Sequence, residues 1–244
     1  MVRLSVNLNK IALLRNSRHT GVPDVAGFGK LALEAGVQGL TVHPRPDARH
    51  IRTSDVHALA ELMAPVRPGV EYNMEGRPTR EFLALVEEVR PEQCTLVPDA
   101  PDAFTSDRGW DLAREGAHVR EVLARLKGQG IRAILFMDPD AAQMDGAAEV
   151  GADGVELYTG TYAEAFRKGD HGKALADVLA AGERAHALGL VVNAGHDLNT
   201  LNLPPIVKPW LREVSIGHEL TADALVWGWA ETLRRYRAAC GQAA

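Results

Sequence analysis

Side chains that can move protons stand at or near the ends of short apolar runs in this chain. His43, Glu75 and His196 each follow such a run, and Glu156 lies within another. Imidazole titrates near neutral pH, and a carboxyl group shielded from water keeps its proton to higher pH, so both suit general acid–base catalysis. The pattern predicts a reaction with several proton transfers.

Cationic groups accompany the first of these histidines in the stretch LTVHPRPDARH, residues 40–50. Arg45 and His50 in this stretch, with Arg18 on an earlier loop, could bind phosphate through paired N–H groups. Gly217 and His218 could present backbone N–H groups to a second anion where the last helix begins. Two anion sites predict two phosphorylated ligands, or one ligand with two phosphates.

Other interpretations of these residues predict different chemistry. The histidines and carboxylates could ligate a metal, but the His-x-His spacing of barrel metallohydrolases is absent, and we predict no catalytic metal. Lys10 is the sole candidate for a Schiff-base lysine after a strand. Arg45, Arg49 and Asp47 could instead form an exposed salt-bridge cluster.

Eight segments with β-branched, apolar character are predicted to be strands: 3–9, 39–44, 69–74, 93–98, 131–137, 154–160, 190–196 and 213–218. Segments of helical period lie between them, including 55–66, 79–89, 117–130 and 172–189, and a final helix is expected over about 221–239. This alternation favours a single (β/α)8 barrel domain spanning residues 1–244, with a nine-strand open sheet as the alternative. The barrel predicts that active-site residues collect at the carboxyl ends of the strands, where Asn7, Asn9 and the residues above lie.

Composition excludes several classes of protein. The 244 residues are 46% hydrophobic and 24% charged, with a net charge of -5, which is typical of a globular protein without a nucleic-acid or membrane-surface partner. The two cysteines have neither metal-ligand nor disulfide spacing, and the N-terminus has no long apolar core. We therefore expect a cytoplasmic protein.

A set of motifs resembles the pyridoxine 5'-phosphate synthase family of vitamin B6 biosynthesis, in unbroken order from about residue 2 to 239. The motifs are VNLNKIALLRNSR (6–18), LTVHPRPDARHI (40–51), NMEGRPT (73–79), CTLVPD (94–99), VELYTG-YA (155–163, with Thr161 in the gap), VNAGHDL (192–198) and SIGHEL (215–220). The resemblance implies a (β/α)8 barrel that assembles into homo-octamers. It also implies condensation of 3-amino-2-oxopropyl phosphate with 1-deoxy-D-xylulose 5-phosphate, without a metal or organic cofactor.

The resemblance also implies roles for individual residues. His43 and Glu75 match the family's proton acceptors, His196 its proton donor, and Glu156 a buried carboxylate that assists the transition state. The positions matching the ketose contacts are Asn9, Lys10, Arg45, His50 and Thr105. The positions matching the aminoketone contacts are Asn7, Arg18, Gly217 and His218, and Asp197 matches a position whose backbone N–H meets a phosphate.

Two departures from the family pattern affect these contacts. Asn9 and Lys10 stand where many members have aspartate and histidine, and Asp197 stands where glycine is usual. Two rival functions share the same residues. Another phosphosugar lyase or isomerase would need fewer acid–base groups and one phosphate site, and an inactive binding protein would be expected to lose His43 or Glu75.

Overall fold

Eight parallel strands form one closed barrel in the computed structural model, which describes residues 1–100, 103 and 105–243. The strands are β1 (Arg3–Asn7), β2 (Gly39–Val42), β3 (Glu71–Gly76), β4 (Gln93–Leu96), β5 (Arg132–Met137), β6 (Gly154–Tyr158), β7 (Val191–Gly195) and β8 (Leu211–Ile216). The first strand pairs with the last, with Leu4 opposite Val214. This closure confirms the predicted (β/α)8 barrel and rules out the open sheet.

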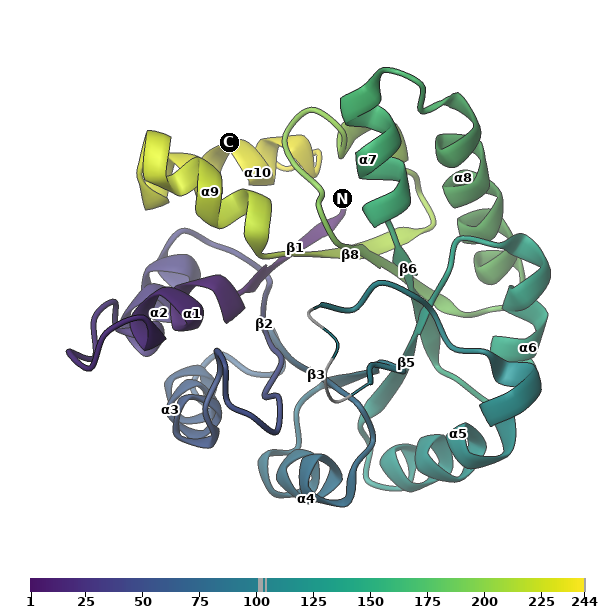
Figure 1. The fold of residues 1–244 in the computed structure, drawn as a ribbon, viewed down its shortest axis with the longest axis horizontal. Coiled ribbons are helices and arrows are strands. Elements are labelled where there is room, and N and C mark those ends of the chain that lie inside the picture. Colours follow the sequence, from purple (N-terminus) through teal and green to yellow (C-terminus); the bar gives the residue numbers. More distant parts are fainter. Residues whose placement is uncertain (101–102, 104, 244) are drawn as a thin grey trace.

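Helices surround the barrel on its outer side (Figure 1). They are α1 (Asn9–Asn16), α2 (Val25–Glu34), α3 (Thr53–Met63), α4 (Arg80–Val89), α5 (Leu112–Lys127), α6 (Met144–Glu149), α7 (Gly160–Lys168), α8 (Gly172–Ala187), α9 (His218–Trp227) and α10 (Trp229–Ala239), with short 3-10 turns at Ala141–Gln143 and Pro204–Ile206. The described part of the chain has no helix long and apolar enough to cross a membrane.

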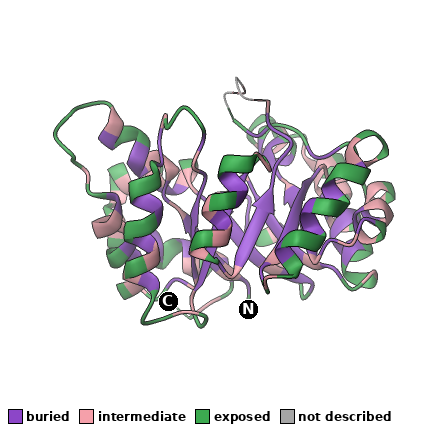
Figure 2. Ribbon diagram, turned by 90° about the horizontal axis from the view of Figure 1, so that it is seen from below, coloured by how far each residue is buried: buried purple, intermediate pink, exposed green. Residues whose placement is uncertain are grey.

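The main apolar core lies between the strands and the helices, because alternate strand residues point outward to the helical layer. Leu4, Val6, Leu40 and Val42 are among its fully buried members. Figure 2 shows the buried strands enclosed by helices whose outer faces are exposed. Burial on both faces explains why the strands are recognisable as apolar runs.

Polar side chains fill part of the barrel interior and bond to one another. The hydroxyl groups of Ser5 and Thr41 lie 2.7 Å apart, and Thr95 donates to Asn73 Oδ1 at 3.1 Å. Because a buried polar group is costly without a partner, these bonds keep the interior stable. The polar interior continues up to the carboxyl ends of the strands.

The final helix differs from the sequence prediction. One helix over 221–239 was expected, and this prediction is wrong, since the chain forms α9 and α10 with a break at Gly228. Gly228 has φ +79° and ψ 156°, a conformation open to glycine and strained for other residues. The apolar period continues across this break, which is why periodicity alone did not reveal it.

Candidate active site

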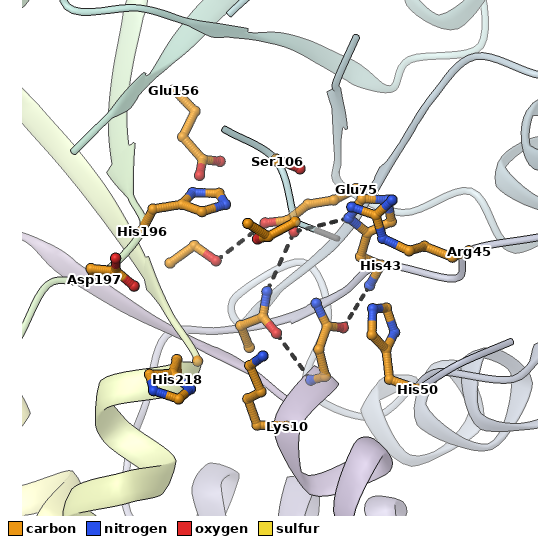
Figure 3. A pocket seen from close by; sticks show the side chains of 15 residues that line it. Lys10, His43, Arg45, His50, Glu75, Ser106, Glu156, His196, Asp197 and His218 are labelled. Carbon is orange, nitrogen blue, oxygen red and sulfur yellow. Dashed lines mark hydrogen bonds and ion pairs between the residues drawn. The ribbon is translucent and has the colours of Figure 1, made fainter. Parts of the chain in front are cut away.

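A cavity of about 290 Å³ opens at the carboxyl ends of the strands (Figure 3). Its lining residues are Asn7, Asn9, Lys10, His43, Arg45, His50, Glu75, Thr105, Ser106, Glu156, His196, Asp197, Ser215, Gly217 and His218. Figure 3 places Glu156 and His196 on one side and His43, Arg45 and His50 on the other, with Glu75 between them. Every site residue predicted from the sequence lines this cavity except Arg18, which lies in the exposed turn after α1.

The loop after β2 is held in place by α1. Arg15 forms a buried ion pair with Asp55, with Nη1 2.6 Å from Oδ1, and Asn16 Nδ2 donates to the His50 carbonyl at 2.8 Å. The backbone N–H of Ile51 donates to His50 Nδ1 at 2.9 Å. Nδ1 is therefore an acceptor, and Nε2 carries the proton of the neutral ring and can donate it.

Arg45 is anchored from the β4 side of the cavity. Its Nη2 forms an ion pair with Asp99 Oδ2, and both side chains are buried. Ser106 Oγ donates to the same carboxylate oxygen at 2.7 Å. Arg49 instead pairs with Asp47 at 2.7 Å near the surface, so Arg45 is not part of the exposed cluster considered as an alternative.

Glu75, at the end of β3, lies at the centre of the cavity and is 6% exposed. Its Oε2 accepts a bond from Asn7 Nδ2 at 3.3 Å, and its Oε1 accepts one from Ser215 Oγ at 3.3 Å. The distance from Oε2 to His43 Nδ1 is 4.0 Å. A carboxyl group and an imidazole so close together can act on one bound substrate, with one group as the acid and the other as the base.

Burial separates the protonation states of this pair. Loss of solvent raises the pKa of Glu75 to about 8, with a smaller contribution from the Asp99 charge. Loss of solvent also lowers the pKa of His43 well below its usual value, and the Arg45 charge lowers it further. At neutral pH Glu75 thus holds its proton while His43 is a free base, which is the arrangement expected of an acid and a base in one site.

A second acid–base pair, Glu156 and His196, lies across the cavity. Burial, followed by the charge of Glu75, raises the pKa of Glu156 well above its usual value, and burial lowers the pKa of His196. A Cβ at Gly195 would lie 2.2 Å from Glu156 Oε1, so glycine at this position leaves room for the carboxyl group. His196 packs against Phe136, with ring centroids 4.9 Å apart.

The remaining wall combines β1, the start of α1 and the start of α9. Asn9 Oδ1 accepts a bond from the His43 backbone N–H at 2.9 Å. A Cβ at Gly217 would lie 3.1 Å from Asn7 Oδ1, so Gly217 lets β8 approach Asn7 closely. Gly217 directly precedes α9, whose first N–H groups and positive dipole end are suited to an anion.

Comparison with known proteins places the chain among enzymes of one pathway. Residues 4–242 match the family described as "Pyridoxal phosphate biosynthesis protein PdxJ". Proteins named pyridoxine 5'-phosphate synthase from Allorhizobium ampelinum and Porphyromonas gingivalis are 53% and 49% identical. These matches cover 99% of both chains for the first relative, and 97% of this chain and 98% of the other for the second.

The chain belongs to the PdxJ family. Solved structures of lower identity share its fold alone. They include a thiamine phosphate pyrophosphorylase from Pyrococcus furiosus, with a TM-score of 0.61 at 12% identity over 98% of this chain and 96% of that one. A tryptophan synthase chain from M. tuberculosis has a TM-score of 0.64 at 13% identity over 99% and 94% of the respective chains.

Two of the residues that depart from the expected family pattern, Asn9 and Asp197, make defined contacts. Asn9 bonds the backbone of His43 through its side chain, a role that an amide oxygen fills as well as a carboxylate. Asp197 has φ +55°, a left-handed conformation that glycine adopts without strain and that aspartate tolerates better than most residues. Its carboxylate lies 3.7 Å from Arg167, which offsets part of its charge.

Two serines of the cavity were missed in the sequence. Ser215 is two residues before Gly217 in the chain, and the alternation of β8 places both toward the interior, so strand period alone could have found it. Ser106 lies in the loop after β4, next to the predicted Thr105, and nothing in its sequence pattern marked it. Within the described residues, no group of three or more His, Cys, Asp or Glu side chains is arranged to hold a metal ion.

Proposed function

We propose that the chain is a pyridoxine 5'-phosphate synthase, a single domain of residues 1–244 that acts in the cytoplasm. It condenses 3-amino-2-oxopropyl phosphate with 1-deoxy-D-xylulose 5-phosphate and releases pyridoxine 5'-phosphate, inorganic phosphate and two molecules of water. The observation that carries this proposal is the gathering of four acid–base side chains in one cavity of a PdxJ-family barrel, between a wall with Arg45 and a wall at the start of α9 that are both suited to an anion. No metal or organic cofactor takes part.

Each acid–base group has a proposed step. The substrate amine attacks the ketose carbonyl, and Glu75, protonated at neutral pH, supplies the proton that helps water leave as the imine forms. His43, a free base, then removes a carbon-bound proton and sets up loss of the ketose phosphate. Glu75, now ionised, and His196 move the protons needed for carbon–carbon closure, for loss of a second water and for aromatisation, with Glu156 beside them.

The two phosphates would bind on different walls. Arg45, His50 and Thr105 receive the ketose phosphate, and Asn9 and Lys10 contact the rest of the ketose. The aminoketone phosphate lies at Gly217 and His218 near Asn7 and the backbone of Asp197. The assignment of Arg18 to the same phosphate stays a prediction, since its side chain lies outside the cavity.

A direct assay tests this function. The purified protein, mixed with both phosphorylated substrates, is expected to produce the ultraviolet absorption of a pyridoxine ring together with one inorganic phosphate for each ring formed. Each substrate alone serves as the control. Conversion of the ketose phosphate alone, with no ring formed from the mixture, would indicate a phosphosugar lyase or isomerase instead.

Chelation is expected to leave the activity unchanged. The proposed steps use only side-chain acids and bases, so exhaustive treatment with EDTA should not alter kcat with either substrate. The measurement compares the treated enzyme with samples to which Mg²⁺, Mn²⁺ or Zn²⁺ is returned. Loss of activity on treatment, restored by one of these ions, would contradict the proposal.

We further propose that the chain assembles into a homo-octamer. Large apolar side chains are exposed on α1 and α9, which contact one another: Leu13, Leu14, Leu225 and Val226. Exposed apolar patches of this kind typically mark protein interfaces.

Light scattering should give a mass about eight times the chain mass of 26.4 kDa. The double change Leu225→Glu, Val226→Glu should lower the measured mass. Val66→Glu, an exposed apolar residue elsewhere, should leave the mass unchanged.

A further inference from the structure

The turn after β7, which carries His196, has an unusual backbone. His196 and Asp197 have φ values of +82° and +55°, so two consecutive residues other than glycine occupy the left-handed half of conformational space. Such a conformation persists only where neighbouring groups hold it, and it is found frequently at functional sites. A group next to the turn must therefore hold it in this conformation.

Thr159, the residue after β6, contacts this turn directly. Its Oγ1 lies 2.5 Å from the Gly195 carbonyl oxygen and 2.7 Å from the His196 carbonyl oxygen. Its backbone N–H also donates to the Gly195 carbonyl, at 2.9 Å. The two carbonyls belong to the peptide groups on either side of the His196 Cα, and the orientation of these two groups determines where the imidazole points. The Thr159 hydroxyl shares its single hydrogen between them.

The surroundings of Thr159 make this bond sensitive to change. The residue is fully buried, and therefore water cannot replace a lost hydroxyl without a rearrangement. The backbone of Gly195 is also close to Glu156, since a Cβ added to Gly195 would lie 2.2 Å from Glu156 Oε1. A shift of the turn would therefore displace this carboxyl group too. On the far side of the turn, Asn202 Nδ2 donates to the Asp197 carbonyl at 3.0 Å, which fixes the turn at its other end.

We propose that Thr159 is a positioning residue for the reaction: its hydroxyl holds the strained turn so that the His196 imidazole points into the cavity. The inference rests on the proposed function, in which His196 takes part in the proton transfers. A bond that served stability alone would have no effect on turnover beyond the loss of folded protein. Thr159 does not line the cavity and acts only through His196.

Two variants of Thr159 separate positioning from stability. Thr159→Val keeps the shape of the side chain and removes the hydroxyl, and a misplaced proton donor is expected to lower kcat about ten- to a hundredfold. The KM for the ketose phosphate should stay within about twofold, because Arg45 and His50 lie on the opposite wall. Thr159→Ser, which keeps the hydroxyl and loses the methyl group, should retain near wild-type kcat.

Thr232→Val is the matched control for stability. Thr232 is also fully buried, and its Oγ1 donates to the Gly228 carbonyl at 2.9 Å in α10, away from the cavity. The same chemical change there should lower the thermal midpoint and leave kcat unaltered. Should Thr159→Val not fold, Thr159→Ala, which also lacks the hydroxyl, takes its place in the comparison with Thr159→Ser.

Two kinetic results would overturn the proposal: wild-type kcat in the folded variant without the hydroxyl, or equal losses in Thr159→Ser and Thr159→Val. A crystal structure of Thr159→Val gives a readout that does not depend on activity. The φ of His196 is expected to leave the positive range, and an unmoved turn would contradict the inference. Failure of the proposed function would give a different result from failure of this inference. If the proposed function is wrong, the wild-type enzyme itself forms no pyridoxine ring.

Discussion

Replacing Glu75 with glutamine is expected to lower kcat by about 10² to 10⁴, the usual contribution of a general acid–base group. Glutamine keeps the size of the side chain and an oxygen for Ser215 or Asn7, but it cannot release or take up a proton at neutral pH. The KM values should change little, since the proposed phosphate contacts lie elsewhere in the cavity. Steady-state kinetics with each substrate varied in turn measures both quantities.

Glu213→Gln provides the matched control for this change. Glu213 is another buried carboxyl inside the barrel, with a pKa raised by burial to about 7 and a hydrogen bond from Gln93 Nε2 at 3.2 Å. It does not line the cavity, and its replacement should therefore leave kcat near the wild-type value. His43→Asn should match the loss seen with Glu75→Gln. Near-normal turnover in either active-site variant would remove that residue from the mechanism.

The pH dependence of kcat should identify Glu75 as the acid. Its carboxyl group is protonated below a pKa of about 8, because burial disfavours the charged form. As the pH rises through this value the proton needed for dehydration is lost, and kcat should fall. Glu75→Gln cannot ionise, so its remaining activity should lack this decline. The proton-acceptor role that the resemblance implies for Glu75 would then apply only after this residue has given up its first proton.

The fold was predictable because each strand of a parallel barrel is buried on both faces. Apolar runs such as 39–44 and 131–137 therefore stood out from the helical segments between them. The position of chemical groups followed from the same rule, since parallel strands place their carboxyl ends on one rim. His43, Glu75 and His196, which are far apart in the chain, could thus be assigned to one site before any distance was known.

Contacts across the barrel were not predictable from strand order. Asp99 was recognised only as part of the motif CTLVPD, yet its carboxylate binds the guanidinium of Arg45. Thr159 lies inside the predicted strand 154–160, while its bonds to Gly195 and His196 depend on how β6 and β7 align. Hydrogen-bond and ion-pair partners of this kind are determined by the register of the strands and by the conformation of the loops. Neither can be recognised from a local pattern in a single sequence.

Arg45→Ala is expected to raise the KM for the ketose phosphate about tenfold to over a hundredfold. The arginine would contribute a charge-assisted contact worth roughly 1.5 to 3 kcal/mol, and each 1.4 kcal/mol is about a tenfold change in affinity. Its loss also leaves the buried Asp99 carboxylate without its cation, close to the place of an incoming phosphate. Both effects act in the same direction, so the upper part of the range is expected.

Two further variants distinguish these contributions. Asp99→Asn in the Arg45→Ala background removes the unpaired carboxylate, and it should recover part of the lost affinity while the loss due to the missing cation persists. Arg49→Ala removes a neighbouring arginine that pairs with Asp47 near the surface, and it should change the KM far less because solvent screens exposed charges. In all three variants the KM for the aminoketone phosphate should stay close to wild type, because its proposed contacts lie at Gly217 and His218. Equal weakening of both substrates, or of neither, would show that Arg45 does not bind the ketose phosphate and that its pair with Asp99 serves the structure of the loop.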